Sequence, residues 1–429
     1  MNRYLLLSLL LAGCAGGPKP APGAQVDPRP ADPIYPGLEE ALAQAGIDSR
    51  GPLLNLEALE ARSPALFTSG LGWYGGLSKE AMIGPRFGAE LVKELDRSVA
   101  AEQPVSQALQ VILALSGKRV TSPRAAPTVG DVKIPDKVPA QLAEALGPIL
   151  TALAAIKEAD AGTHRMLRAA IKLAQAVEGA RLKRFAGSKV DAWWYVPGLG
   201  KVILAGPGDD THSYPGPRSL GASVALLLDT GGSDIYRMPA GANTPGESLA
   251  SVHIDLGGDD KYEAGEFGQG AGQRGVGLLW DLGGGADTYQ TAGSGQGAGA
   301  HGVGVLLDDG GDDKYVGVRG AQGAGMDGVG VLIDLGGDDK YDTFTRSQGF
   351  GGPGGHGVLY DAAGNDKYRA DPGDPEQGGE LRYPSPQLPN SGNASLGQGA
   401  AAGMRDDNNG QHRVGGVGLL RDRAGDDSY

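Results

Sequence analysis

The sequence predicts an α+β chain of several domains, in which an N-terminal helical domain precedes a repetitive β-solenoid of the parallel β-helix or β-roll type, with about 26 residues per coil. Two observations lead to this expectation. A pattern that reads DLGGDDKY in its clearest copy, at 255–262, recurs seven times in the second half of the chain. The first half lacks this pattern and places Ala and Leu at helical spacing.

The repeat period favours a solenoid over other repeat architectures. The first Asp of successive copies recurs at steps of 26 or 27 residues, and a last step of 61 residues indicates one unit with an insertion at 369–395. A propeller blade needs about 40 residues, whereas one unit here has room for only two or three short strands and their turns. Each coil should therefore contain the Asp turn, a short segment, a second Gly-rich turn such as QGAG at 269–272, and a strand such as GVGVLLD at 302–308.

The apolar run of each repeat alternates as a β-strand does. In 302–308, Val303 and Val305 share one face, whereas Gly302 and Gly304 share the other. We expect the Val face to line the interior of the solenoid. The Gly face should allow another layer of chain to approach closely.

The N-terminus has the features of a lipoprotein signal. Residues 1–13 hold a short apolar run after a basic residue, with the length of a signal-peptide core rather than of a transmembrane helix. The run closes with Leu11-Ala12-Gly13-Cys14, which resembles the lipobox of bacterial lipoproteins. The resemblance implies cleavage before Cys14 and acylation of this residue as a membrane anchor. An ordinary secretory signal with an incidental Cys is the alternative.

Composition divides the rest of the chain. Residues 14–36 are rich in Pro and predict an extended tether. By analogy with the sorting rule of Gram-negative lipoproteins, Ala15 after the acylated Cys indicates the outer membrane of such a host. Residues 37–196 should form a helical domain that caps the solenoid, and 197–429 the solenoid itself. The formal net charge of −13 argues against nucleic acid as a partner and favours cations.

The motif also predicts two columns of stacked aspartates. Equivalent residues on neighbouring coils lie about 4.8 Å apart. At that distance two carboxylates repel by roughly 1 kcal/mol in water and by about 3–4 kcal/mol at an effective dielectric constant near 20. The first and second Asp of each copy form the columns, namely Asp229, Asp255, Asp281, Asp308, Asp334, Asp361 and Asp422, and Asp234, Asp260, Asp287, Asp313, Asp339, Asp366 and Asp427.

Three arrangements would neutralise such columns. Calcium accepts carboxylate and carbonyl oxygens, backbone N–H groups of each turn could donate to its own Asp, and the Lys after the second Asp could neutralise it imperfectly from the opposite face. The turn Gly258-Asp259-Asp260-Lys261-Tyr262 resembles part of the nonapeptide repeat of RTX proteins, G-G-x-G-x-D-x-U-x. The resemblance implies a parallel β-roll in which all the aspartates of the two columns, with turn carbonyls, bind calcium between coils. This chain departs from the nine-residue spacing of that family, because it has only one motif in each coil.

Two functions from different classes fit these patterns. A non-enzymatic lipoprotein of the cell envelope would use the solenoid as a surface for binding, adhesion or structural contact, with a polysaccharide or a protein as its ligand. A polysaccharide-active lyase or hydrolase is the alternative, and it would use residues that break the repeat, such as Arg346, His356 and Asp406. No nucleophile accompanies the variable positions His301 and Asp327, which we expect to be solvated. The motif tyrosines should also stack, and we expect them to pack in the interior rather than to bind sugars.

Overall fold

The structure is a computed structural model, and it confirms the predicted fold class. Among the residues that it describes, four helices precede a β-solenoid of about six turns between residues 201 and 370, with about 26 residues per turn. The predicted anchor at Cys14, the tether at 14–36 and most of the insertion at 369–395 lie outside the described residues. The structure describes residues 85–115, 132–156, 163–213, 223–243, 245–246, 248–370, 380–381, 393–394, 396–406, 411–413 and 415–429.

The helices are amphipathic and pack against one another. In α6, Leu142, Leu146 and Ile149 recur at helical spacing and are buried, so one stripe of the helix faces the core. No described helix is both long enough and apolar enough to cross a membrane. The helical elements are α4 (Pro85–Val99), α5 (Pro104–Leu115), α6 (Ala140–Ala154), α7 (Thr163–Ala180) and the 3-10 turn η5 (Leu182–Phe185).

The apolar runs of the repeats form one long sheet, sheet A. Its strands pair in parallel with the same motif position in register, as Asp308 pairs with Asp334, and only β1 is antiparallel to its neighbour β2. In spatial order the strands are β1 (Ala192–Val196), β2 (Gly200–Ala205), β4 (Val224–Asp229), β6 (Ala250–Asp255), β9 (Val276–Asp281), β12 (Val303–Asp308), β15 (Val329–Asp334), β17 (His356–Asp361) and β23 (Val417–Asp422).

The strands that begin beside the motif Tyr form a second parallel sheet, sheet B, and the segments after the QGAG turns form a short third one. Sheet B contains β3 (Thr211–Ser213), β5 (Ile235–Arg237), β7 (Lys261–Glu266), β10 (Thr288–Gly293), β13 (Lys314–Arg319), β16 (Lys340–Thr345) and β18 (Lys367–Ala370). The third sheet contains β8 (Gly272–Gln273), β11 (Gly299–Ala300) and β14 (Gly325–Met326). Two antiparallel pairs complete the described strands, β19 (Glu380–Leu381) with β20 (Asn393–Ala394) and β21 (Met404–Asp406) with β22 (Gln411–Arg413).

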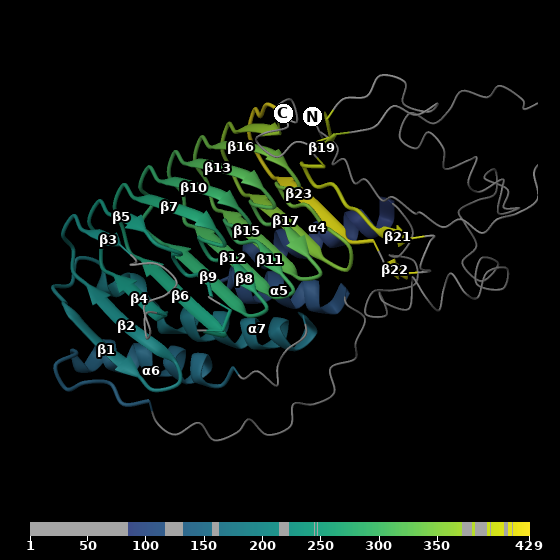
Figure 1. Cartoon of the computed structure of the whole chain (residues 1–429). Helices are drawn as coiled ribbons and strands as arrows, with labels where there is room; N and C mark the ends of the chain where they lie inside the picture. Colours follow the sequence, from purple (N-terminus) through teal and green to yellow (C-terminus); the bar gives the residue numbers. More distant parts are fainter. Residues whose placement is uncertain are drawn as a thin grey trace, which may run out of the picture.

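The helices lie along the solenoid rather than at its end (Figure 1). Helix α7 contacts β9 and β12, Thr163 donates to the carbonyl of Asp327 at 2.7 Å, and the hydroxyl of Tyr360 donates to the Asp96 carboxylate at 2.9 Å. The expectation that the helices cap the end is therefore wrong. Strand β1 covers the edge of sheet A instead, and it comes from the segment that we assigned to the helical domain.

The two faces of sheet A are both buried, which the alternation pattern alone does not reveal. Val303 and Val305 belong to the core that includes the helices, whereas Leu306 packs with the motif tyrosines between sheets A and B. The prediction that the Val face lines the interior is wrong, because the helices supply an apolar layer outside the coil. The prediction for the Gly face is confirmed: a Cβ on Gly304 would lie 2.0 Å from the carbonyl oxygen of Ala298, in the segment packed against it.

Candidate functional site

The structure brings the predicted aspartates into two columns at the turns that join sheet A to sheet B. The first Asp ends each strand of sheet A from β4 onward, and the second lies just before each strand of sheet B from β5 onward. From Asp229 to Asp366, all members of both columns are at most 2% exposed. Asp422 and Asp427, in the last coil, are only partly buried. Such burial excludes water from most of the carboxylates, so their charge must be answered within the protein.

From Asp255 to Asp361, each first Asp accepts hydrogen bonds on both carboxylate oxygens, whereas Oδ1 of Asp422 in the last coil has no partner. In the coils before the last, Oδ1 of the first Asp accepts the backbone N–H two residues later in its own turn, as Asp308 accepts from Gly310 at 2.8 Å. Its Oδ2 accepts the hydroxyl of the motif Tyr in the preceding coil, at 2.5–2.8 Å in five successive coils. The predicted own-turn N–H bonds are thus present for this column, and the Tyr hydroxyl is a donor that the sequence did not indicate.

Each second Asp is satisfied on one oxygen only. Its Oδ1 accepts the backbone N–H of the equivalent Asp in the preceding coil, as Asp313 accepts from Asp287 at 2.7 Å. These bonds therefore join coils rather than close one turn. The other oxygen, Oδ2, is buried without a hydrogen-bond partner in Asp260, Asp287, Asp313, Asp339 and Asp366.

The second-column aspartates also lie close to other carboxylates. Asp287, Asp308 and Asp313 each offer an oxygen within 4.8 Å of the other two, and Asp313, Asp334 and Asp339 repeat the arrangement one coil later. Two carboxylates so close cannot both remain charged at low dielectric, and a shared proton supplies the missing donor. The second Asp is the natural carrier, because its Oδ2 lacks any other partner.

Burial and neighbouring charges change the acidity of these groups accordingly. Burial, with the charges of Asp308 and Asp334 added, raises the pKa of Asp313 to about 11. Burial, with the charges of Asp281 and Asp308 for Asp287 and of Asp334 for Asp339, raises the pKa of both groups to about 10. Burial also holds the pKa of Asp308 well above its ordinary value, and the charge of Asp334 adds to the effect. Protons therefore remain on part of the ladder at neutral pH.

The donor set of the central coils fits calcium poorly. Calcium takes six to eight oxygens at about 2.3–2.6 Å. Here three carboxylates meet, but both oxygens of the first Asp and one of the second already accept hydrogen bonds. Because the groups are at most 2% exposed, water cannot complete the coordination shell. Calcium in the ladder stays a prediction, and the described hydrogen bonds account for the ladder without it.

The motif tyrosines and the glutamines after them hold successive coils together. The Tyr rings stack at 4.7–5.0 Å between centroids from Tyr236 to Tyr429, and all but the last are at most 2% exposed, which confirms a packing role. Gln296 donates from Nε2 to the carbonyls of Tyr289 and Val316, on two successive coils. It does so with φ at +52°, in a region that few non-glycine residues adopt.

The turn glycines are required by the stacking of the coils. In Gly258, φ is +154°, and a Cβ would lie 1.5 Å from the carbonyl oxygen of Gly232 in the preceding coil. Any other residue would push two coils apart. The Lys that follows the second Asp, such as Lys261, is exposed, so its side chain points away from the buried carboxylates.

The irregular residues that the enzyme alternative would use occupy separate elements. His356 lies in β17 and is 4% exposed, and burial lowers its pKa to about 4. Asp406 ends β21, which pairs with β22 in a separate two-stranded sheet of the described residues rather than with a strand of sheet A. His301 and Asp327 form a partly exposed ion pair at 3.1 Å, which agrees with a solvated position.

The structure adds an eighth copy of the motif that the sequence reading missed. Ala205 pairs with Asp229, and His212 pairs with Tyr236, so 205–212 is a degenerate turn with Ala for the first Asp and His for Tyr. Asp210 takes the second Asp position. Gly208-Asp209-Asp210 was the available signal, but the two substitutions hid it.

Comparison with models of known protein families, with curated proteins and with solved structures gives no match. The chemistry of the columns is therefore argued from their geometry alone.

Proposed function

We propose that the protein is a non-enzymatic lipoprotein of a bacterial cell envelope, which holds a rigid solenoid at the outer membrane as a display surface. Acylated Cys14 is the anchor, and residues 14–36 are the tether. The observation that carries the proposal is the direction of the motif side chains: the buried Asp, Tyr and Gln of each repeat bond to the neighbouring coil. The repeated chemistry thus serves to stack coils and not to contact a substrate.

One broad face of the solenoid is available for contact. Sheet A is covered by the helices on its outer side, whereas the outward residues of sheet B, such as Lys261, Glu263 and Lys314, are exposed. Arg237 and Glu263 form an ion pair across neighbouring strands of this face at 2.9 Å. A flat, regular face with both signs of charge suits a polysaccharide or a protein ligand that is bound over several coils.

Shared protons, rather than calcium ions, neutralise the interior of this scaffold. The proposal rests on the buried Oδ2 atoms of aspartates that lie close to a second carboxylate. A scaffold of this kind keeps its shape without any ion supplied by the surroundings. Calcium would instead make the display surface dependent on the calcium concentration outside the cell.

Expression of the full chain in a Gram-negative host tests the anchoring. The wild-type protein should incorporate labelled palmitate and fractionate with the outer membrane, whereas the matched variant Cys14→Ser should do neither and should be recovered in a folded, unlabelled form. Because Cys14 is the only Cys, the loss of label is attributable to one site. Wild-type protein that is unlabelled and released would contradict the anchor.

The same preparations separate display from catalysis. Incubated with neutral and with uronate-containing polysaccharides, the protein should bind without shortening the chains, as followed by size-exclusion chromatography and reducing-end assays. Chain cleavage that is lost in His356→Gln would overturn the non-enzymatic proposal in favour of the polysaccharide-active enzyme.

A further inference from the structure

The first coil of the solenoid places a His among the aspartates and leaves them uncovered. His212 takes the position of the motif Tyr, and its ring stacks on Tyr236 at 5.1 Å with the planes 8° apart. Its Nε2 lies 3.3 Å from Oδ2 of Asp229. In the coils that follow, the hydroxyl of the motif Tyr makes the equivalent hydrogen bond to the first Asp of the next coil. The imidazole therefore keeps the architecture of the column with its Nε2, and its other ring nitrogen is one that can bind a metal.

Three potential ligands meet in this coil. One ligand atom each from Asp210, His212 and Asp234 lies within 4.8 Å of the other two. Atoms that bind one zinc ion at about 2.0–2.2 Å lie at most about 4.4 Å apart, so small rotations of the side chains would suffice. These residues come from the turn before β3, from β3 itself and from the turn before β5.

A buried carboxylate oxygen with only one long hydrogen-bond contact also lies at this place. Asp234 is 1% exposed, and its Oδ2 lies 3.4 Å from the Tyr236 hydroxyl. That hydroxyl has a single proton, which it donates to Asp255 at 2.5 Å. Oδ2 of Asp234 therefore receives no proton from Tyr236. It has an acceptor site free in a cluster that contains an imidazole.

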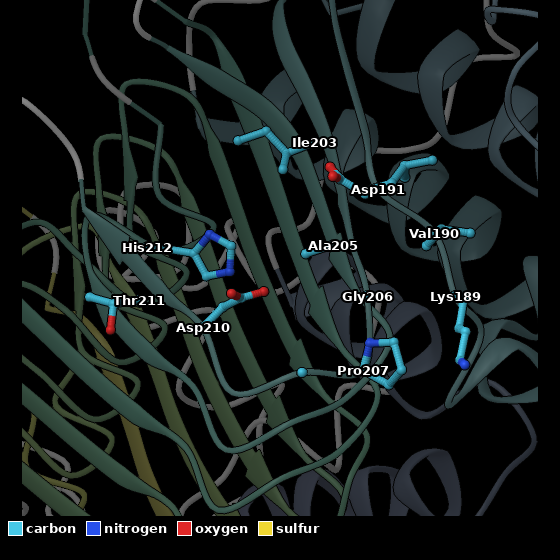
Figure 2. A pocket seen from close by; sticks show the side chains of 12 residues that line it. Lys189, Val190, Asp191, Ile203, Ala205, Gly206, Pro207, Asp210, Thr211 and His212 are labelled. Atoms are coloured by element: carbon cyan, nitrogen blue, oxygen red, sulfur yellow. The ribbon is translucent and has the colours of Figure 1, made fainter.

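Water can reach this cluster, unlike the central ladder. A groove of about 570 Å³ opens beside Asp210 and His212, between the start of β3 and the segment that leads into β1. Figure 2 shows the His212 ring and the Asp210 carboxylate next to each other on one side of the groove, with Lys189 and Asp191 on the other. Asp210 is exposed and His212 is half-buried. Solvent could thus supply the remaining ligands of an ion.

We propose that Asp210, His212 and Asp234 form a binding site for a divalent transition-metal ion, with zinc as the best match. One imidazole and two carboxylates, with a fourth position open to water, is a donor set that zinc accepts, whereas calcium and magnesium prefer oxygen ligands alone. Asp229 hydrogen bonds to His212 and orients the ring, as carboxylates beside metal-bound His do. The ion would close the exposed end of the Asp columns.

The test is a calorimetric zinc titration of the full chain carrying Cys14→Ser, so that no thiol contributes. The comparison variant is His212→Tyr, which restores the repeat and retains the stacking and the hydroxyl bond to Asp229. We expect a single zinc site, with at least about a 100-fold loss of affinity in His212→Tyr, because loss of a mere supporting group already costs 10–100-fold. His301→Gln, which alters the exposed His–Asp pair elsewhere, should leave the affinity unchanged.

Two further measurements keep the outcome unambiguous. Thermal melts show whether His212→Tyr is folded. Asp210→Asn is a second variant, at an exposed position, and it retains the hydrogen bond that the backbone N–H at this position donates to Asp234. Cobalt bound in place of zinc should give visible absorption bands that change in both variants. Two results would overturn the proposal. Either the parent protein does not bind zinc, or folded His212→Tyr and Asp210→Asn bind zinc as tightly as the parent protein does.

Discussion

The central coils and the first coil contain the same acidic turn, yet they differ in what covers it. In the centre, neighbouring coils on both sides bury the carboxylates, and Tyr hydroxyls and backbone N–H groups occupy most of their oxygens. In the first coil, Asp210 is exposed and a His replaces the Tyr. The comparison teaches that one motif supports two chemistries. In the buried turns of the central coils the carboxylates share protons, whereas the exposed turn of the first coil has room for a metal ion and its water ligands.

The largest expected effect that sharpens this comparison is the pH dependence of the central ladder. Asp287, Asp313 and Asp339 have folded-state pKa values of about 10, 11 and 10, raised mainly by burial. When folding raises the pKa of an Asp, its contribution to the free energy of unfolding is fully present below the pKa of the unfolded state, near 3.9. This contribution falls as the pH rises toward the pKa of the folded state. Each such Asp contributes a decrease of up to about 1.4 kcal/mol per pH unit.

Thermal melts at pH 5 and pH 9, each with chelator and with millimolar calcium, check this expectation. The melting temperature should be higher at pH 5 in chelator, and calcium should change it little. Around Asp313, the facing charges are Asp287, Asp308 and Asp334, while Lys314 points outward. A higher melting temperature at pH 9, or a large upward shift with calcium, would assign the ladder to the metal instead.

The next largest effect comes from the stacked rings. Tyr315→Ala removes a ring that is 0% exposed and lies between Tyr289 and Tyr341, and we expect a loss of about 3–5 kcal/mol in the free energy of unfolding. The matched change at the open end, His212→Ala, should cost less than about 1.5 kcal/mol, because that ring stacks on one side only and is part exposed. Urea denaturation measures both. Equal losses would mean that the centre of the column and its first coil do not differ in packing.

The smallest effect distinguishes the two Asp positions within one coil. Asp313→Asn should cost less than about 1 kcal/mol, because the amide accepts from Asp287 with its oxygen and donates where the shared proton was. Asp308→Asn should cost about 1–3 kcal/mol, because both of its carboxylate oxygens accept from donors, Gly310 and Tyr289. Urea denaturation at pH 7 gives both values. The reverse order would place the proton on the first column.

Much of this architecture could be predicted from the sequence, because the spacing of one motif fixes the coil. The step of 26 or 27 residues gave the solenoid and the stacking of the aspartates. The position of the helices could not be predicted, since a run such as 303–307 is apolar on both faces and does not say which face meets helices. The role of the Tyr hydroxyl depends on the offset between coils, which joins Tyr289 to Asp308 rather than to the Asp of its own turn. The copy at 205–212 could not be recognised in the sequence, because Ala205 and His212 replace the first Asp and the Tyr of the motif.

The close contact between turn glycines limits how such a chain can change in length. Where the carbonyl of Gly232 fills the space that a side chain on Gly258 would need, the rise from one turn to the next has no slack. The corner accepts one extra small residue, because 281–287 is one residue longer than 255–260 and the strands on both sides of it stay in register. The long step of 61 residues places its additional sequence at two other points, after Ala370, beyond a strand of sheet B, and between Ala402 and Gly416, where β21 pairs with β22. The longer insertions thus lie away from the turn glycines, and these two points are where a designer should attach a fused domain.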